Sequence, residues 1–138
     1  MIFLDSWVWL EYLLGGDAQD AAEEIIRLAA SPDEGGLIAP TVVTEVAYRV
    51  RVESDRATAE EVVRAIDDLD DVECLPLVAS VAEYAAELRY KYYDCERRAF
   101  SYADAIHLAT AVVHDECTVL YSGDPDFADV DEIETVVI

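Results

Sequence analysis

The sequence predicts a three-layer α/β/α sandwich built on a mainly parallel sheet of about five strands. Short apolar runs alternate with segments of helical period, which is the pattern of strand–helix units in a parallel sheet. A chain of 138 residues has room for one domain with one substantial core. No linker, internal repeat or low-complexity stretch interrupts the pattern. We therefore expect residues 1–138 to form a single domain.

The expected elements follow one another with short connections. The predicted strands cover residues 2–4, 37–39, 72–75, 118–121 and 134–137. The predicted helices cover residues 6–14, 18–30, a segment capped by Pro40-Thr41 and reaching Val50, then 59–69, 81–92 and 101–114. The last of these helices is nearly all apolar, so it is expected in the middle of the structure.

Charge is the most unusual property of the composition. Thirty-one acidic residues oppose nine basic ones, which gives a net charge of −22. Because 54% of the residues are hydrophobic, the acids are expected on a folded surface and not in a disordered tail. In molar salt the Debye length falls to about 3 Å and the mutual repulsion largely disappears. We interpret the acidity as adaptation to a salt-rich cytoplasm.

Targeting and redox features are also informative. No apolar run approaches the roughly 18 residues that span a bilayer. The first residues carry no basic segment and meet Asp5 early, which is unlike a signal peptide. Cys74, Cys95 and Cys117 are odd in number and lack Cys-x-x-Cys spacing, so we expect reduced thiols. These features predict a cytoplasmic protein without a membrane segment.

Four acids are expected to meet at one edge of the sheet, where parallel sheets bind ligands beyond the carboxyl ends of their strands. Asp5 follows the first strand, and Asp124 follows the fourth after a two-residue turn. Glu45 lies one turn into the helix after the second strand, and Asp104 lies in the first turn of the apolar helix. Asp126 is expected close to Asp124 because only Pro125 separates them.

Such a cluster predicts a divalent-cation site. Neighbouring carboxylates repel one another, so without a cation at least one is expected to hold a proton with a raised pKa. All-oxygen ligation suits Mg²⁺ or Mn²⁺. One or two such ions lower the pKa of bound water and stabilise the oxygens that attack and leave in phosphodiester hydrolysis. The sequence has neither a Gly-x-Ser-x-Gly nucleophile nor a Gly-rich phosphate loop.

Each acid taken singly also has a structural explanation. The explanations are a capping box with Ser101 for Asp104, an ion pair with Arg49 for Glu45, a helix N-terminal acceptor for Asp5 and an Asx turn for Asp124. Their joint placement favours a site. His107 is instead predicted to be a satisfied core histidine, and His114 a helix C-terminal residue favoured by the dipole.

The same acids carry a resemblance to PIN-domain nucleases. The stretch Phe3-Leu4-Asp5-Ser6-Trp7-Val8-Trp9-Leu10 resembles the first motif, Thr44-Glu45-Val46 the second, Tyr102-Ala103-Asp104-Ala105-Ile106-His107-Leu108-Ala109 the third, and Tyr121-Ser122-Gly123-Asp124-Pro125-Asp126-Phe127 the fourth. The four occur in order across essentially the whole chain. At this length the chain looks most like VapC-type toxins.

The resemblance implies a magnesium-dependent ribonuclease that a VapB-type antitoxin holds inactive. It also implies that the four acids bind the metal, that Asp126 is an auxiliary acid, and that Ser6 and Ser122 are hydroxyl neighbours of the metal. Ser122 stands where a threonine is common, and Pro125 stiffens the turn that carries Asp126. The alternatives are a stand-alone RNA-processing nuclease of the same fold and a non-catalytic interaction module.

Two other phosphoryl-transfer folds also place acids at strand ends. A haloacid-dehalogenase domain has Asp-x-Asp after its first strand, whereas Asp5 is followed here by Ser6 and Trp7. That fold and the receiver domain both need a lysine late in the chain. The single lysine, Lys91, comes well before the last strands. Both folds are therefore disfavoured.

Two basic stretches could hold RNA beside this edge. Seven of the nine basic residues fall in them: Arg49, Arg51 and Arg56, then Arg89, Lys91, Arg97 and Arg98. Both stretches could contact phosphates, and tyrosines at 90, 92 and 93 could stack on unpaired bases. The alternative is that the basic side chains neutralise neighbouring acids. The sequence favours this alternative for the first stretch and leaves both interpretations open for the second.

The first helix is more apolar than burial of one face requires. Its large apolar residues are Trp7, Trp9, Leu10, Tyr12 and Leu13. Part of this surface is expected to serve a homodimer or an antitoxin interface. The alternative is ordinary packing against the second helix.

Overall fold

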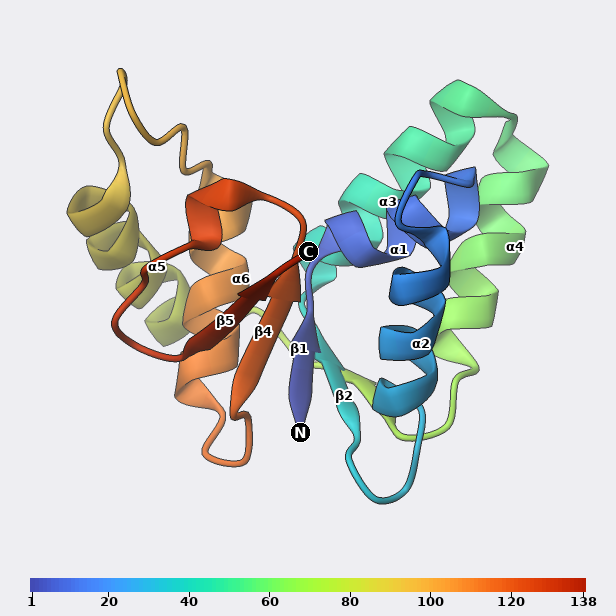
Figure 1. Ribbon diagram of the computed structural model, residues 1–138, viewed down its shortest axis with the longest axis horizontal. Coiled ribbons are helices and arrows are strands. Elements are labelled where there is room, and N and C mark those ends of the chain that lie inside the picture. Colours follow the sequence, from blue (N-terminus) through green and yellow to red (C-terminus); the bar gives the residue numbers. More distant parts are fainter.

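A computed structural model describes all residues, 1–138, as one five-stranded sheet with helices on both faces (Figure 1). The strands are β1 (Ile2–Leu4), β2 (Gly36–Ile38), β3 (Val72–Cys74), β4 (Val119–Ser122) and β5 (Glu134–Val137). The helices are α1 (Ser6–Leu14), α2 (Gln19–Ala29), α3 (Pro40–Glu53), α4 (Arg56–Asp67), α5 (Ala79–Tyr92), α6 (Tyr102–Val113) and the short 3₁₀ helix η1 (Pro125–Phe127). The predicted fold class is confirmed.

The strand order β3-β2-β1-β4-β5 explains how the layers form, and every pair of neighbours is parallel. The chain moves outward from β1 through β2 to β3, and α1 to α4 lie on one side of the sheet in Figure 1. It then returns to β4 on the other side of β1, and α5 and α6 lie on the opposite face. Right-handed crossovers give this division.

The reversal of direction between β1 and β4 marks where a ligand site is expected. These two strands pair through Ile2 with Val119 and Leu4 with Tyr121. Their onward connections leave in opposite directions, so the carboxyl ends of β1 and β4 are not both covered by one crossover. Asp5 and Asp124 follow these two strand ends.

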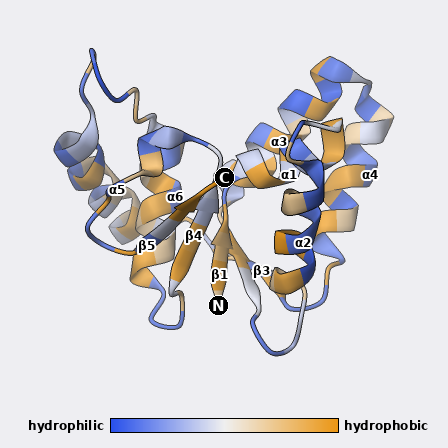
Figure 2. Ribbon diagram, viewed as in Figure 1, coloured by the Kyte–Doolittle hydropathy of each residue, from blue (hydrophilic) through white to orange (hydrophobic).

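The core lies on both faces of the central strands. Phe3, Leu4, Leu37 and Leu120 are fully buried. The hydrophobic colouring of β1 and β4 in Figure 2 follows this burial. Helix α6 contacts three of the central strands, and its run from His107 to Ala111 is buried. The prediction that the apolar helix lies in the middle of the structure is confirmed.

Several helix starts differ from the predictions by one to three residues, and those of α4 and α3 have identifiable causes. Helix α4 begins at Arg56 and not at residue 59, because the side chain of Asp55 accepts a hydrogen bond from Thr58 N at 2.8 Å. This first turn is polar, so hydrophobic periodicity could not reveal it. Helix α3 begins at Pro40 itself, after Ala39, and the Thr41 hydroxyl makes no hydrogen bond. Proline suits a first helical position because its missing N–H has no partner there.

No helix of the structure is both long enough and apolar enough to cross a membrane.

Candidate active site

Asp5 is the innermost acid, at the junction of β1 and α1. Its backbone N–H donates to the Tyr121 carbonyl at 3.0 Å, which extends the pairing of β1 with β4 by one residue. Its side chain accepts from Trp7 N at 3.4 Å and caps α1. Only 3% of Asp5 is exposed. The carboxylate is therefore held in one place by both the sheet and the helix.

Two further side chains bind Asp5 from neighbouring elements. His107 Nδ1 of α6 lies 2.7 Å from Asp5 Oδ1, and Ser122 Oγ of β4 donates to Asp5 Oδ2 at 2.7 Å. Burial alone would raise the pKa of Asp5, but the hydrogen bonds from His107 and Ser122 and the charge of His107 hold it below its usual range. Asp5 is thus kept as a buried carboxylate.

Glu45 approaches the same histidine from α3. Its Oε2 lies 3.7 Å from His107 Nε2, and neither atom has a hydrogen-bond partner although both are buried. Burial raises the pKa of Glu45, and the charges of Asp5 and Asp104 raise it further, against lowering by Ser6 and His107. A cation beside Glu45 would supply the partner that its Oε2 lacks and would offset the like charges of Asp5 and Asp104.

Asp104 is positioned by the first turn of α6. Its Oδ2 accepts from Ser101 N at 2.6 Å, while its own N–H donates to Ser101 Oγ at 3.0 Å. This is the predicted capping box, and it uses only one oxygen of the carboxylate. Burial raises the pKa of Asp104, and the charge of Asp5 adds to the effect.

The turn after β4 positions Asp124. Its N–H donates to Ser122 Oγ at 3.0 Å, and its Oδ1 accepts from Asp126 N at 2.8 Å, which is the predicted Asx turn. Gly123 is needed in this turn because the indole ring of Trp7 lies against it. An added Cβ at Gly123 would come 2.0 Å from that ring.

These side chains surround one open cavity of about 320 Å³ beyond the carboxyl ends of β1 and β4. The lining residues are Asp5, Ser6, Trp7, Leu10, Glu45, Tyr48, Arg49, Asp104 and Asp124. The four predicted acids and Ser6 thus meet, as the sequence suggested. Ser122 is fully buried behind Asp5, and Asp126 does not line the cavity.

Comparison with known families agrees with this arrangement. The PIN domain family model matches residues 2–133. The chain belongs to the PIN domain family. A search of curated proteins gave no match.

Solved structures resemble this PIN domain over nearly its full length. VapBC2 from Rickettsia felis, bound to a DNA fragment from its promoter, is 16% identical with a TM-score of 0.75, covering 99% of this chain and 98% of that one. VapC20 from Mycobacterium tuberculosis, a toxin that cleaves the sarcin–ricin loop, is 20% identical with a TM-score of 0.73, covering 96% and 98%. FitAcB from Neisseria gonorrhoeae is 19% identical with a TM-score of 0.69, covering 98% and 96%.

The acids of this PIN domain are suited to a hard cation but are not a ready-made ligand cage. No three of its His, Cys, Asp and Glu side chains are grouped closely enough to hold a metal ion. However, Glu45 Oε2 is buried without a partner, and Asp104 and Asp124 each keep one oxygen free of hydrogen bonds. The donors are carboxylates alone, as Mg²⁺ and Mn²⁺ prefer. Binding would require the other acids to close in on Asp5.

Three of the four structural explanations predicted for the single acids are confirmed, and one is not. Those for Asp5, Asp104 and Asp124 are confirmed, and in each case the same side chain also lines the cavity. The ion pair of Glu45 with Arg49 is absent. Arg49 Nη2 lies instead 3.6 Å from Glu53 Oε1, one turn further along α3. An ion pair within α3 therefore does not explain the position of Glu45.

His107 is the residue whose role sequence reasoning missed. It is fully buried, as predicted, but only one of its ring nitrogens is satisfied. Because it lies three residues after Asp104 in α6, it shares a helix face with that acid. That spacing was the signal available in the sequence. His114 is the C-cap residue of α6, as predicted.

The second basic stretch is largely occupied by contacts within the protein. Lys91 binds Asp131 and Glu132 at 3.0 and 2.8 Å. Arg89 donates to the Phe100 carbonyl and lies over the rings of Tyr93 and Tyr102, with centroid distances of 4.3 and 4.2 Å.

Arg98 is held in a similar way, since it donates to the Ala128 carbonyl at 2.7 Å. Of the four predicted RNA-binding bases, only Arg97 is exposed and makes no ion pair. The neutralising interpretation, which the sequence left open for this stretch, is therefore favoured for Lys91. Arg89 and Arg98 hold the loop between α5 and α6.

Proposed function

We propose that this PIN domain is a metal-dependent endoribonuclease that hydrolyses RNA phosphodiester bonds. The observation that carries the proposal is the meeting of Asp5, Glu45, Asp104 and Asp124, from four separate elements, around one cavity. Membership of the PIN domain family supports nuclease chemistry, and VapC20, a structure of the same fold, is an RNA-cleaving toxin.

The four acids would have different roles, because Asp5 is held firmly by hydrogen bonds and Glu45 Oε2 is not. Asp5 is fixed by His107 and Ser122 and would anchor the cation, with Asp104 and Asp124 completing its coordination. Mg²⁺ or Mn²⁺, when bound, supplies Lewis-acid activation of water and charge stabilisation. Glu45 Oε2, unpaired and with a raised pKa, is the atom suited to accept a proton from the attacking water. Asp126 would act from the rim, through Asp124.

Cleavage of a labelled single-stranded RNA tests this proposal directly. Mg²⁺ or Mn²⁺ should support cleavage, a chelator should stop it, and Asp5→Asn should abolish it while the circular dichroism spectrum stays unchanged. A variant that cuts at the wild-type rate in matched metal and salt would show that the site is assigned wrongly. A wild-type protein that binds RNA without cutting it under any of these conditions would favour the non-catalytic module.

We further propose that the chain is the toxin of a VapBC-type pair and binds a small VapB-type antitoxin. Similar structures include VapBC complexes and a toxin–antitoxin complex from Klebsiella pneumoniae. An apolar groove of about 360 Å³ between α1, α2 and α4 would receive an apolar segment of the partner. An arginine of the antitoxin is suited to enter the acidic cavity because its fork engages two carboxylates.

The structure sharpens the test of this partner. Trp9 is 3% exposed and belongs to the core, so a charged residue there would unfold the protein. Tyr12 is half-buried and lines the groove, so Tyr12→Asp is the informative variant. It should release a co-expressed antitoxin, encoded by the small reading frame beside the gene, without changing free-enzyme cleavage.

Recovery of the chain alone, with no growth arrest when it is expressed without that neighbour, would contradict the toxin proposal. A stand-alone RNA-processing nuclease would then be the better description. Gel filtration of the free chain tests the expected homodimer.

A further inference from the structure

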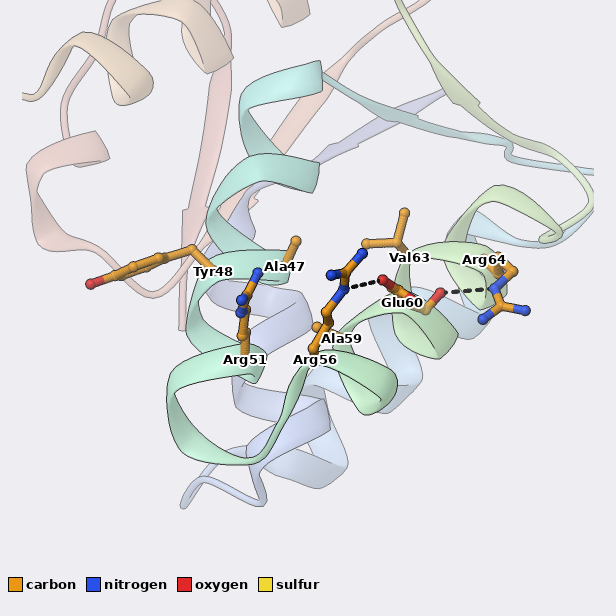
Figure 3. Close-up of a pocket in the computed structure, with 8 residues that line it drawn as sticks. All are labelled: Ala47, Tyr48, Arg51, Arg56, Ala59, Glu60, Val63 and Arg64. Atoms are coloured by element: carbon orange, nitrogen blue, oxygen red, sulfur yellow. Dashed lines mark hydrogen bonds and ion pairs between the residues drawn. The ribbon is translucent and has the colours of Figure 1, made fainter.

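A second cavity lies between α3 and α4, next to the acidic one. Its volume is about 740 Å³, and Figure 3 shows the side chains that line it. Three arginines, Arg51, Arg56 and Arg64, line it together with a single acid, Glu60. We refer to the cavity between these three arginines as the basic cleft.

The charge of the basic cleft is opposite to that of the whole protein. Three arginines and one glutamate give the lining a net charge of +2, whereas the chain as a whole carries −22. If these arginines served only to neutralise acids, each arginine would be expected to have its own acidic neighbour, because the chain has 31 acidic residues. Instead, three of the nine basic residues gather around one carboxylate.

The arginines are exposed and only partly engaged. Arg56 Nε binds Glu60 Oε1 at 2.6 Å, and Arg64 Nε donates to the Glu60 carbonyl at 3.1 Å, as the dashed lines in Figure 3 mark. The hydrogen bond from Arg56, with smaller effects of Arg64 and Arg51, holds the pKa of Glu60 below its usual range. Arg51 makes no ion pair, so its guanidinium is free for an anion.

Helix α3 joins the basic cleft to the acidic cavity. Glu45, Tyr48 and Arg49 line the acidic cavity, while Tyr48 and Arg51 line the basic cleft. Glu45 and Arg51 are six residues apart, which is about 9 Å along a helix axis. Tyr48, which borders both cavities, is 66% exposed, and Figure 3 shows its ring pointing away from the arginines.

We propose that the basic cleft binds the phosphates of the RNA strand on one side of the bond that is cut, and that Tyr48 stacks on an unpaired base between the two cavities. The proposal rests on the ribonuclease function proposed above. Arginine forks bind phosphate oxygens in pairs, and an exposed aromatic ring binds any base through its face. An RNA strand lying along α3 would thus be held next to the acidic cavity, although the acids of that cavity repel its phosphates.

This placement reverses the preference of the sequence. Spacing favoured neutralisation for Arg49, Arg51 and Arg56, and left RNA binding open for the stretch from Arg89 to Arg98. In the fold, most bases of the second stretch are committed to internal contacts, whereas α4 brings Arg56 and Arg64 alongside Arg51. Arg64 was not in either stretch, because only the packing of α3 on α4 adds it.

The test compares Arg51→Gln with Arg27→Gln in the full chain. Arg27 is an exposed arginine of α2 that pairs with Glu24 at 3.8 Å and lines neither the acidic cavity nor the basic cleft, so it is a matched control for loss of one positive charge. Arg51 makes no ion pair, so its loss should not lower the melting temperature. Binding of a fluorescent single-stranded RNA is measured by anisotropy in the Asp5→Asn background, where the RNA stays intact.

Arg51→Gln should weaken binding and lower the slope of log affinity against log salt by about 0.7, the contribution of one phosphate contact on a single strand. The double variant Arg51→Gln/Arg56→Gln should weaken binding by roughly tenfold and lower the slope by about 1.4. Tyr48→Ala should weaken binding further, and Tyr48→Phe should restore it. In cleavage assays the double variant should raise KM and leave kcat unchanged. This effect should appear only for RNAs extended on one side of the cut.

The proposal would be overturned if Arg51→Gln had the same RNA affinity and salt slope as Arg27→Gln. It would also be overturned if Arg97→Gln lost RNA binding and Arg51→Gln did not. Loss of a co-expressed protein partner, with RNA binding intact, would assign the basic cleft to an acidic segment of that partner. If the chain binds RNA through the basic cleft but never cuts it, the nuclease function fails and the basic cleft stands. If the double variant cuts RNA with an unchanged KM, the nuclease function stands and the RNA-binding role of the basic cleft fails.

Discussion

At the scale of residues, three of the four candidate acids are held by hydrogen bonds that also stabilise the start of a helix or a turn. Asp5 caps α1, Asp104 closes a capping box, and Asp124 forms an Asx turn. These hydrogen bonds fix the three acids beside one cavity, and they leave one oxygen each of Asp104 and Asp124 without a hydrogen bond. Glu45 is the exception, since it has burial and like charges around it and no partner for Oε2.

Replacing Glu45 with glutamine should therefore stabilise the metal-free protein. The pKa of Glu45 is raised chiefly by burial, so its ionised form is less favourable in the folded than in the unfolded chain. The resulting cost is present above the raised pKa and disappears as the pH falls below the ordinary range of a glutamate. Melting curves of Glu45→Gln and wild type in chelator should differ at pH 7 and converge near pH 4. A lower melting temperature for the variant at pH 7 would contradict the assignment.

Ser122 should act through Asp5 and not on the substrate. Ser122 Oγ donates to Asp5 Oδ2 and accepts from Asp124 N, so Ser122→Ala removes one support from each acid. Loss of such a supporting hydrogen bond typically reduces metal affinity or activity by roughly 10- to 100-fold. Titration of cleavage with Mg²⁺ should show a higher metal requirement. Ser122→Thr keeps the hydroxyl and should restore the wild-type requirement, and equal behaviour of both variants would argue against this role.

At the scale of elements, the helix starts link stability to the site. Ser101 caps α6 and holds Asp104 through two hydrogen bonds. Helix α4 has a similar cap at Asp55, which does not line the acidic cavity. The two caps therefore allow helix stability to be separated from positioning of the site.

Ser101→Ala should lower the free energy of unfolding by about 1 kcal/mol, the usual effect of losing an N-cap. The variant keeps the backbone N–H that binds Asp104 Oδ2 but loses the hydroxyl that accepts from Asp104 N, so the first turn of α6 is held less firmly and RNA cleavage should slow. Asp55→Ala should lower stability and leave the cleavage rate of a short RNA unchanged. Chemical denaturation and initial rates measure the two effects. Equal losses of activity in both variants would show that stability alone explains them.

At the scale of the whole molecule, the net charge of −22 and the acidic cavity should respond to different ions. Monovalent salt screens repulsion over the entire surface. A divalent ion bound only by the folded protein stabilises it by mass action. Both additions should raise the melting temperature, but for different reasons.

Asp124→Asn should separate the two responses. The variant should lose most of the shift caused by millimolar Mg²⁺ or Mn²⁺ and keep the shift caused by molar KCl. Asp131→Asn, which removes an exposed acid outside the cavity, provides the control for loss of one charge. An unchanged metal response in Asp124→Asn would show that divalent ions bind the general acidic surface.

Local sequence patterns predicted the α/β architecture and the five strands, and they indicated that four acids lie at one edge of the sheet, because alternating apolar periods and acids after strand ends can be read segment by segment. They also placed three capping acids correctly. They could not reveal the polar first turn of α4, since a cap at Asp55 leaves no apolar signature. Nor could they show that Glu45 lacks Arg49 as a partner.

Contacts between side chains from different elements could be seen only in the three-dimensional structure. It brought His107 between Asp5 and Glu45, committed Lys91 to Asp131 and Glu132, and grouped arginines from α3 and α4 in the basic cleft. Such contacts join residues far apart in the chain, or on different helices. They depend on how helices pack across the sheet, and the period of a single segment carries no information about that packing.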